Sequence, residues 1–487
     1  MRHFLIISVA RLMLAASACM VGPNYKRPAA PVSAAFKEPL PDGWKEAQPN
    51  DGVIRGKWWE VYNDPQLNAL EEQVSISNQN VAEAEANFRA ARYAIRIARA
   101  NLFPTVTAGP TLGVSRSAGA GFAAGGSGPI TGGSNVITTY SLPASASWPV
   151  DIWGSVRRGV RASEATAQSD FALLENARLS YQSELAQDYF ELRGTDGDVD
   201  LLERTVKSYD DYLTLTKNRY KAGVASGADV AQAQTQLDTT RAQLIDLGVA
   251  RAQFEHAIAI LTGKPPAALT LSAGLLKTPP PVVPVALPSA LLERRPDIAS
   301  AERQMASVQE QIGIAVAAYY PTLDLSGSAG FSGQFTKGFL WPSRFFSLSS
   351  ALSETVFEGG KRRAQVKQAE ALFDASVATY RETVLTAFQQ VEDDLAALKI
   401  LADESVAVDQ AVKAAEESLT ISTAQYKAGT INYLQVIIAQ AAALAAERTA
   451  VDLLARRMVS SVLLIQALGG GWDSKTIPTP GELQQSQ

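Results

Sequence analysis

The feature that most constrains the fold is the stretch from Lys361 to Gln425, which contains neither proline nor glycine. The whole chain contains 24 prolines and 34 glycines, so a stretch of this length without either residue is informative. These residues are the strongest helix breakers, and their absence predicts one continuous α-helix. At 1.5 Å per residue the helix would be roughly 95 Å long, too long for a compact globule. We expect it to act as a spacer.

An apolar seam follows this predicted helix. It consists of Leu385, Phe388, Val391, Leu395 and Leu398, which recur at intervals of three or four residues, the spacing of a coiled coil. A partner helix is predicted from Asn432 to Leu468. The matching stripe in the first half of the chain is formed by Leu237, Leu244, Leu247, Phe254, Ile258 and Leu261.

The chain is a tandem duplication. The segment 80–109 aligns with 297–327 at an offset of 217 residues, and RYKAG (219–223) aligns with QYKAG (425–429) at an offset of 206. The first half therefore carries 11 additional residues between these landmarks, since 217 minus 206 is 11. We place them in the low-complexity loop 118–135.

Each half predicts a helix, a β-hairpin, and two long helices joined at a Tyr-Lys-Ala-Gly turn. We expect the first repeat at 66–274, with its hairpin at 104–150 and its tip near 223. A proline-rich linker at 275–290 joins it to the second repeat at 291–470, whose hairpin lies at 321–357 and whose tip lies near 429. A C-terminal tail follows at 471–487. In the first repeat, the glycines of RGTDGD (193–198) are expected to break or kink the long helix.

Two segments alternate between apolar and small polar residues. In TLDLSGSAGFSG (322–333) the apolar set runs from Leu323 to Phe331 at every second position. TYSLPASASW (139–148) alternates in the same way, with Pro143 as a flaw in the ladder. A period of two predicts strands with one apolar and one polar face. Each segment has about the 9 to 11 residues that cross a bilayer when tilted.

A soluble hairpin packed on a helix is the alternative reading of these strands. Against it, the polar face is mainly Ser, Thr and Gly, which suits a wet lumen, and aromatic residues gather in FLWPSRFF (339–346), as at a membrane interface. Two hairpins give four strands, which cannot close a barrel, and open edges in lipid are costly. Membrane strands would therefore require several chains, and three copies would give twelve strands.

The N-terminus has the pattern of an export signal. A positive start precedes the apolar stretch FLIISVARLMLAASA (4–18), which Arg11 interrupts. We expect residues 1–18 to be a signal peptide.

The sequence AASAC (15–19) resembles a bacterial lipobox, in which the cysteine is lipidated and becomes the mature N-terminus. Several acyl chains, at about 0.8 kcal/mol per buried CH2 group, anchor a protein durably. A plain signal peptide with an incidental cysteine is the alternative. We expect lipidation of Cys19, followed by a lipid-anchored tail and equatorial segment at 19–65. Met20, where an aspartate would favour the inner membrane, fits the outer membrane.

Composition argues against several kinds of chemistry. The net charge is −5, which gives no reason to expect a nucleic-acid partner. The chain has one cysteine and two histidines, His3 and His256, and these are poor material for a metal site. EGGKRR (358–363) lacks the first glycine of a phosphate-binding loop. We expect no catalytic residues, no metal, no cofactor and no enzymatic activity.

Four motifs carry a resemblance to a known family. CMVGPNYKRP (19–28) is similar to the mature N-terminus of NodT-type lipoproteins. The further motifs are WWEVYNDPQLNALEEQVSISNQN (58–80), LPSALLERRPDIASAE (287–302) and ALGGGW (467–472). Together they resemble TolC-type outer-membrane efflux factors over nearly the whole chain. The pair Trp58 and Trp59, taken alone, is more often a packing anchor.

The resemblance implies a fold class, an α+β membrane protein assembled as a homotrimer. Its twelve strands, four per chain, would form an outer-membrane β-barrel continuous with a long α-helical barrel in the periplasm. The channel would conduct small amphiphilic compounds, such as drugs, passively. Its partners would be outer-membrane lipid, a periplasmic adaptor (a membrane fusion protein) and an inner-membrane transporter, for which the resemblance favours the proton-driven resistance-nodulation-division (RND) type.

The resemblance also places the periplasmic tips at the two Tyr-Lys-Ala-Gly turns. Tyr220 and Gly223 mark the first turn, and Tyr426 and Gly429 mark the second. Adaptor hairpins dock around such turns in the family. Asp229 stands where the family carries an aspartate that bonds a tyrosine of the neighbouring coil, here Tyr426.

One position departs from the family pattern at the tip. Where the family often has a ring of aspartates, this chain has Gln435 and Ile438. The departure argues against cation binding there. We hypothesise that an apolar ring of Ile438 closes the channel by packing and dewetting.

Three other functions stay open at this point. An outer-membrane conduit of a type I-like secretion system would use the same fold for another cargo. A structural coiled-coil envelope lipoprotein would have no use for the alternating strands. A periplasmic adaptor usually has one helical hairpin beside compact β domains, not a duplicated set.

Overall fold

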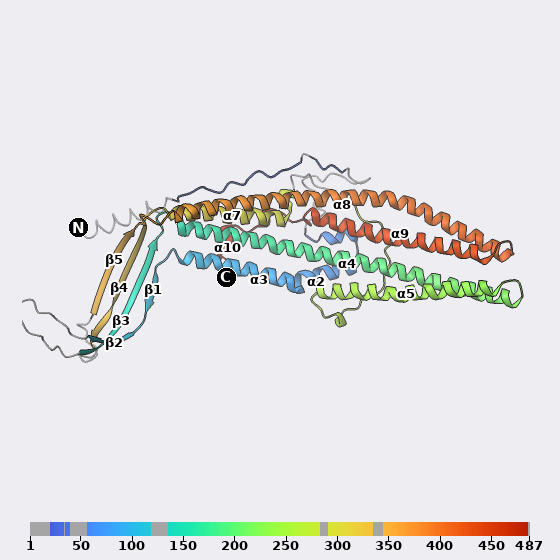
Figure 1. The fold of residues 1–487 in the computed structure, drawn as a ribbon, viewed down its shortest axis with the longest axis horizontal. Helices are drawn as coiled ribbons and strands as arrows, with labels where there is room; N and C mark the ends of the chain where they lie inside the picture. Colours follow the sequence, from blue (N-terminus) through green and yellow to red (C-terminus); the bar gives the residue numbers. More distant parts are fainter. Residues whose placement is uncertain are drawn as a thin grey trace, which may run out of the picture.

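The computed structural model describes residues 20–33, 35–38, 56–117, 135–282, 291–334 and 344–485. The described part is elongated, with a β-sheet at one end and long helices extending away from it (Figure 1). The expected signal peptide, Cys19, residues 118–134 of the loop and the second half of the proline-rich linker, 283–290, lie outside the described residues.

Four long helices form most of the molecule. They are α4 (Ser155–Lys221), α5 (Gly227–Leu261), α8 (Lys361–Ala428) and α9 (Tyr433–Ala467). α8 covers the whole proline-free and glycine-free stretch, so the prediction of one continuous helix is confirmed. The shorter helices are α2 (Pro65–Ser77), α3 (Gln79–Ala100), α6 (Leu291–Arg294), α7 (Pro296–Ala317) and α10 (Pro480–Gln485), with 3-10 turns at Trp58–Tyr62, Pro266–Ala268 and Ser474–Thr476. No helix within the described ranges has the length and apolar character of a membrane-crossing helix.

The predicted break at RGTDGD is wrong, because α4 runs through this sequence without interruption. The two glycines lie against α9 instead. A Cβ atom at Gly194 would lie 2.8 Å from the Cβ of Ala455, and one at Gly197 would lie 2.9 Å from Cγ1 of Val451. The glycines therefore allow two helices to approach closely.

The strands form one antiparallel sheet that joins the two repeats. β1 (Thr105–Ala108) and β2 (Thr111–Ser117) both pair with β3 (Asn135–Val150), β3 pairs with β4 (Thr322–Gln334), and β4 pairs with β5 (Arg344–Ser353). Because β1 and β2 share one edge of β3, the sheet has four strand positions. In the described chain, no further strand pairs with β5 or with the outer edge of β1 and β2.

Pro143 does not interrupt the sheet. It lies within β3 opposite Gly330 of β4. A Cβ atom at Gly330 would lie 2.2 Å from the carbonyl oxygen of Leu142. The close approach of the two strands at this point therefore requires glycine.

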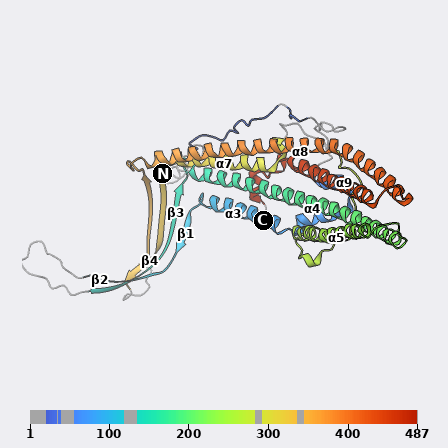
Figure 2. The same cartoon turned by 45° about the vertical axis from the view of Figure 1, so that its right-hand side comes forward.

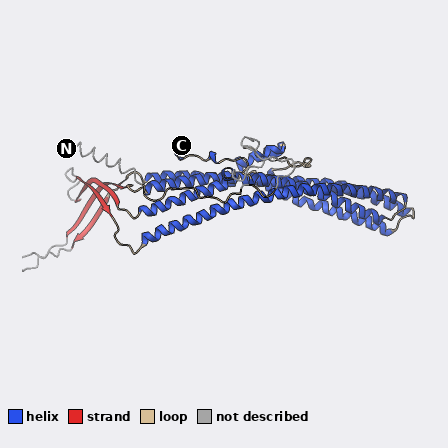
Figure 3. Ribbon diagram, turned by 90° about the horizontal axis from the view of Figure 1, so that it is seen from above, coloured by secondary structure: helices blue, strands red, loops and turns tan. Residues whose placement is uncertain are grey.

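The helices nearest the sheet follow the order of its strands. α3 packs against α4, α4 against α7, and α7 against α8, as Figure 2 shows from a second direction. Farther from the sheet, α5 packs against α4, and α9 packs against α8 and α4. Figure 3 shows that strands occupy only the end of the molecule and that helices make up the remainder.

The predicted seam of α8 is buried for most of its length. Val391, Leu395 and Leu398 are buried in the described chain, and Phe388 packs against the same core. The seam was wrong at Leu385, which is 48% exposed, whereas the adjacent Val384 is fully buried. The helix therefore presents Val384 to its neighbours at this turn.

Candidate functional site

The sheet has one face of hydroxyl groups. Two rows of hydroxyl side chains cross all four strand positions, namely Thr105, Ser147, Ser326 and Ser349, and Thr107, Ser145, Ser328 and Ser347. The hydroxyl oxygens of Ser326 and Ser349 lie 2.7 Å apart, and those of Ser328 and Ser347 lie 2.8 Å apart. Hydroxyl groups bind water without carrying a net charge, so this face is suited to line an aqueous channel.

The opposite face of the sheet is apolar and uncovered within the described chain. The strand register places Val106, Leu142, Phe346, Leu348 and Leu352 on this face. Phe346 is 87% exposed and Leu348 is 86% exposed. An apolar surface of this kind marks contact with a membrane or a partner. The two-faced strands predicted from the period of two are confirmed.

Tryptophan side chains lie where the sheet meets the helices. The indole N–H of Trp148 donates to the carbonyl oxygen of Leu102 at 3.1 Å. The indole N–H of Trp153 donates to the carbonyl oxygen of Pro321 at 2.8 Å, and its ring stacks on Tyr320 at 4.6 Å. Tryptophan and tyrosine concentrate at membrane–water interfaces. The junction therefore has the composition of an interfacial belt.

The two tip turns lie at the end of the helices farthest from the sheet (Figure 1). Gly223 and Gly429 have φ angles of +75° and +79°, a left-handed conformation that ends a helix and favours glycine. The amide of Val224 then donates to the carbonyl of Arg219 at 3.0 Å. The Thr430 amide makes the equivalent 3.0 Å bond in the second turn, to Gln425.

The equivalent tyrosines of the two turns differ in their exposure to solvent. Tyr426 is 3% exposed and packs in a buried cluster with Tyr433 and Tyr209. The guanidinium of Arg219 lies 4.6 Å from the Tyr426 ring centre and donates to the Tyr426 carbonyl at 3.2 Å. Tyr220, at the equivalent place in the first turn, is 54% exposed. The second turn is thus anchored to α4, whereas the first presents its tyrosine to solvent.

The predicted bond between Asp229 and Tyr426 is not formed within one chain. Asp229 is the third residue of α5, and its carboxylate accepts the backbone N–H of Ser226 at 2.9 Å. The Ser226 hydroxyl accepts the Asp229 N–H at 3.1 Å, which completes a capping box. The Tyr426 hydroxyl lies 3.5 Å from that of Thr216. Within one chain, the Asp229 carboxylate therefore caps the start of α5.

Gln435 and Ile438 both lie in the first turns of α9, close to the second tip. The Gln435 amide approaches the Asn432 side chain at 3.4 Å, and the Gln435 side chain is exposed. Ile438 is 60% exposed and Leu434, four residues earlier on the same helix face, is 47% exposed. The tip therefore carries a small uncovered apolar patch.

The segment after Cys19 is held by Arg158, which the sequence reasoning missed. The guanidinium of Arg158 is fully buried, donates to Glu310 at 2.7 Å, and donates to the carbonyls of Val21, Gly22 and Pro23 at 2.7, 2.9 and 3.2 Å. A Cβ atom at Gly22 would lie 2.8 Å from the Cα of Gly313. Arg158 comes from the first repeat and Glu310 from the second. The only signal in the sequence was the run of arginines that opens α4.

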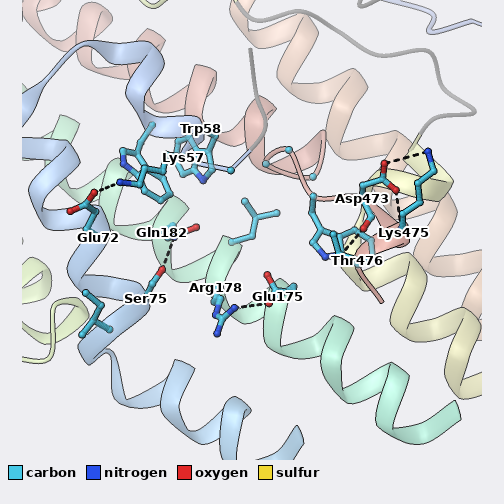
Figure 4. A pocket seen from close by; sticks show the side chains of 18 residues that line it. Lys57, Trp58, Glu72, Ser75, Glu175, Arg178, Gln182, Asp473, Lys475 and Thr476 are labelled. Atoms are coloured by element: carbon cyan, nitrogen blue, oxygen red, sulfur yellow. Dashed lines mark hydrogen bonds and ion pairs between the residues drawn. The ribbon is translucent and has the colours of Figure 1, made fainter. Parts of the chain in front are cut away.

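Two of the family-like motifs, 58–80 and 467–472, line a pocket of about 820 Å³ (Figure 4). Trp58 and Trp59 are buried there, so their interpretation as packing anchors is confirmed. Gly469 belongs to the closing motif, and a Cβ atom there would lie 1.9 Å from the Arg294 carbonyl oxygen. On the rim, Arg178 pairs with Glu175, among other polar contacts. These motifs therefore serve close packing.

Two carboxyl groups in the helical region are perturbed. Burial, reinforced by the neighbouring Asp393 carboxylate, raises the pKa of Asp394 to about 7. Burial also raises the pKa of Glu71 well above its usual range, and both of its carboxyl oxygens lack a hydrogen-bond partner in the described structure. Among the described residues, no group of three or more His, Cys, Asp or Glu side chains is placed to hold a metal ion.

Known proteins of the same architecture are similar to this chain in sequence. The family model of the outer membrane efflux protein matches residues 70–264 and 287–470. The chain is 30% identical over 474 residues to the outer membrane protein OprJ of Pseudomonas aeruginosa, with 96% of each chain covered. It is 28% identical to the toluene efflux pump outer membrane protein TtgC of Pseudomonas putida, with 97% of this chain and 96% of the relative covered.

A solved structure agrees with these relatives. The outer-membrane channel OprN is 28% identical, with a TM-score of 0.83, and the match covers 93% of this chain and 100% of that one. The likeness confirms the expected fold class, an α+β membrane protein whose strands belong to an outer-membrane β-barrel that continues into a periplasmic helical barrel. The expected outer-membrane location and efflux role are confirmed with it. The chain belongs to the outer membrane efflux protein family.

Proposed function

We propose that three copies of this chain form the exit channel of a tripartite efflux pump that exports small amphiphilic compounds. The observation that carries the proposal is the sheet, which has a hydroxyl face, an apolar face and two open edges. Unpaired strand edges cost several kcal/mol per backbone group in lipid, so the sheet has to be completed by further copies. Three copies supply twelve strands, and the hydroxyl face then lines the lumen.

The tips of the helices are the proposed docking site for a periplasmic adaptor. They lie at the end opposite the sheet, and Tyr220 is exposed in the first turn. The adaptor would connect the channel to an inner-membrane transporter of the RND type. The channel itself would perform no chemistry, since the energy is supplied by the transporter. The toluene efflux role named for the relative TtgC favours small apolar or amphiphilic cargo.

Lipidation of Cys19 is part of the proposal. Met20 is the first described residue, and it packs beside Gly154 at the junction of helices and sheet. A lipid on the preceding residue would therefore be next to the membrane strands. We also propose that Ile438 closes the resting tip, because it is exposed near the end of the helices.

A cross-linking experiment in living cells tests the docking site. A photoreactive aromatic residue is placed at Tyr220, with a matched control at Tyr93 of α3, which is 59% exposed but near the sheet end. The proposal predicts capture of an adaptor and a transporter from position 220 and of neither from position 93. Capture from position 220 of a protein-secretion machinery would favour a type I-like conduit. Capture of peptidoglycan-associated proteins alone would favour a structural tether.

A further inference from the structure

A basic pocket lies where the helices meet the sheet. It has a volume of about 630 Å³, and its lining includes Arg99, Arg157 and Arg161, with Glu164 as the one acidic lining residue. Among the described residues, the lining side chains sum to +2, from three positive and one negative, and the Asp151 carboxylate that pairs with Arg157 lowers the local charge to +1. Nothing in the proposed export mechanism accounts for this concentration of arginine.

Arg157 and Arg99 are held in different ways. Arg157 pairs with the Asp151 carboxylate at 3.1 Å and also donates to nearby backbone carbonyls. Arg99, in the last turn of α3, donates to the side chain of Gln484 at 2.6 Å. Gln484 in turn donates to Glu164 at 2.7 Å, so one amide from α10 positions both charged groups. The side chains of Arg99 and Arg161 are exposed.

The pocket lies at the level of the membrane surface. Its lining includes Met20, the residue after the predicted lipid anchor, and Leu102, whose carbonyl accepts the indole N–H of Trp148. Trp153 lies within a few residues of Arg157 and stacks on Tyr320. Tryptophan side chains lie at the depth of lipid headgroups. With the sheet spanning the outer membrane as proposed, guanidinium groups at that depth would face the phosphate layer of the inner leaflet.

We propose that this pocket binds the phosphate of an anionic phospholipid of the outer membrane. Arginine presents pairs of N–H donors that match phosphate oxygens, and basic pockets at this depth attract anionic headgroups. The apolar side chains of Met20, Leu102 and Val160 line the same pocket and provide contact for the glycerol and the first acyl carbons. The inference depends on the membrane position of the sheet and is independent of the pump partners. Inorganic phosphate shares the chemistry and is separated from the lipid by competition.

The test compares a pocket variant with a charge-matched control. The pocket variant is Arg99→Gln with Arg161→Gln, which leaves the Arg157–Asp151 pair in place. The control is Lys361→Gln with Arg363→Gln, which removes the same charge from exposed side chains at the start of α8, outside the pocket. The full-length protein in detergent is incubated with dioleoylphosphatidylglycerol or dioleoylphosphatidylcholine, and retained lipid is counted by native mass spectrometry.

We expect the pocket variant to retain phosphatidylglycerol at least about tenfold less than the natural protein, from the loss of two cations near the headgroup. The control should retain it normally, phosphatidylcholine should be retained weakly by all three proteins, and millimolar inorganic phosphate should not displace the bound lipid. Equal retention by the pocket variant would overturn the proposal. So would an equal loss in the control, or displacement by inorganic phosphate. Size-exclusion chromatography before the assay ensures that only assembled protein is compared.

Discussion

Replacing Arg158 by methionine should release the segment that follows the lipid anchor. The guanidinium is fully buried, and its partner Glu310 is buried as well. The ion pair measures 2.7 Å, and three carbonyls of the N-terminal segment depend on the same side chain. Removing one partner of a buried pair costs about 3–5 kcal/mol, because the other charge stays buried without compensation.

Most of this loss should fall on the segment Met20–Arg27, because Arg158 binds three of its carbonyls. The later part of the segment is also held by the bond from Tyr25 to Glu302 and by the bonds from Arg27 to Tyr380, and these remain in the variant. A decrease of about 3 kcal/mol in the free energy of opening raises the open population roughly a hundredfold, at about 1.4 kcal/mol per factor of ten. Trypsin reports the opening, because the Lys26–Arg27 bond lies within the segment. Cleavage follows the open population when opening and closing are fast compared with proteolysis.

Two further variants make the assay specific. Arg158→Met combined with Glu310→Gln removes the uncompensated charge and should be cleaved more slowly than the single variant. Arg204→Met removes a surface arginine that pairs with Asp200 on the same helix, and should be cleaved at the natural rate, because exposed pairs contribute about 0–1 kcal/mol. An unchanged cleavage rate in Arg158→Met would refute the assignment of Arg158 as the anchor.

Three other predictions concern packing, pH and the tip. Gly194→Ala should lower the thermal unfolding temperature, because its Cβ would lie 2.8 Å from Ala455, whereas Gly248→Ala, with no atom within 4 Å, should leave it unchanged or raise it. Burial raises the pKa of Asp394 from 3.8 to about 7, so the folded protein loses stability as the pH rises through this range. Asp394→Asn should therefore stabilise the protein more at pH 8 than at pH 5. An equal change in the free energy of unfolding at both pH values would contradict the assignment. Ile438→Asp should increase resting leak of a small dye in planar bilayers, with Ile245→Asp as an exposed control on α5.

The sequence was most informative where a pattern extends over many residues. The stretch after Lys361 predicts α8 because the absence of proline and glycine acts on every turn of the helix. The alternation in 322–333 predicts β4 and its two faces, because neighbouring side chains in a strand always point in opposite directions. Both predictions depend on local geometry alone.

The contacts between repeats were not predictable in this way. The glycines of RGTDGD are helix breakers by local preference, and only the position of α9 explains why they lie inside α4. Asp229 is drawn into the capping box at the start of α5, a contact that the family pattern of the tip did not indicate. Arg158 and Glu310 are distant in sequence, so nothing local indicates that they meet.

The central claim is that copies of the chain complete one another's sheet, and the edge strands test it most directly. Val106→Cys in β1 is combined with a single cysteine at successive positions of β5 (Arg344–Ser353), and the membranes are oxidised. The account predicts that at least one β5 position gives intermolecular cross-links whose largest product on a denaturing gel is a covalent trimer. Monomers alone at every position, or a ladder that continues beyond three chains, would contradict a closed twelve-stranded barrel.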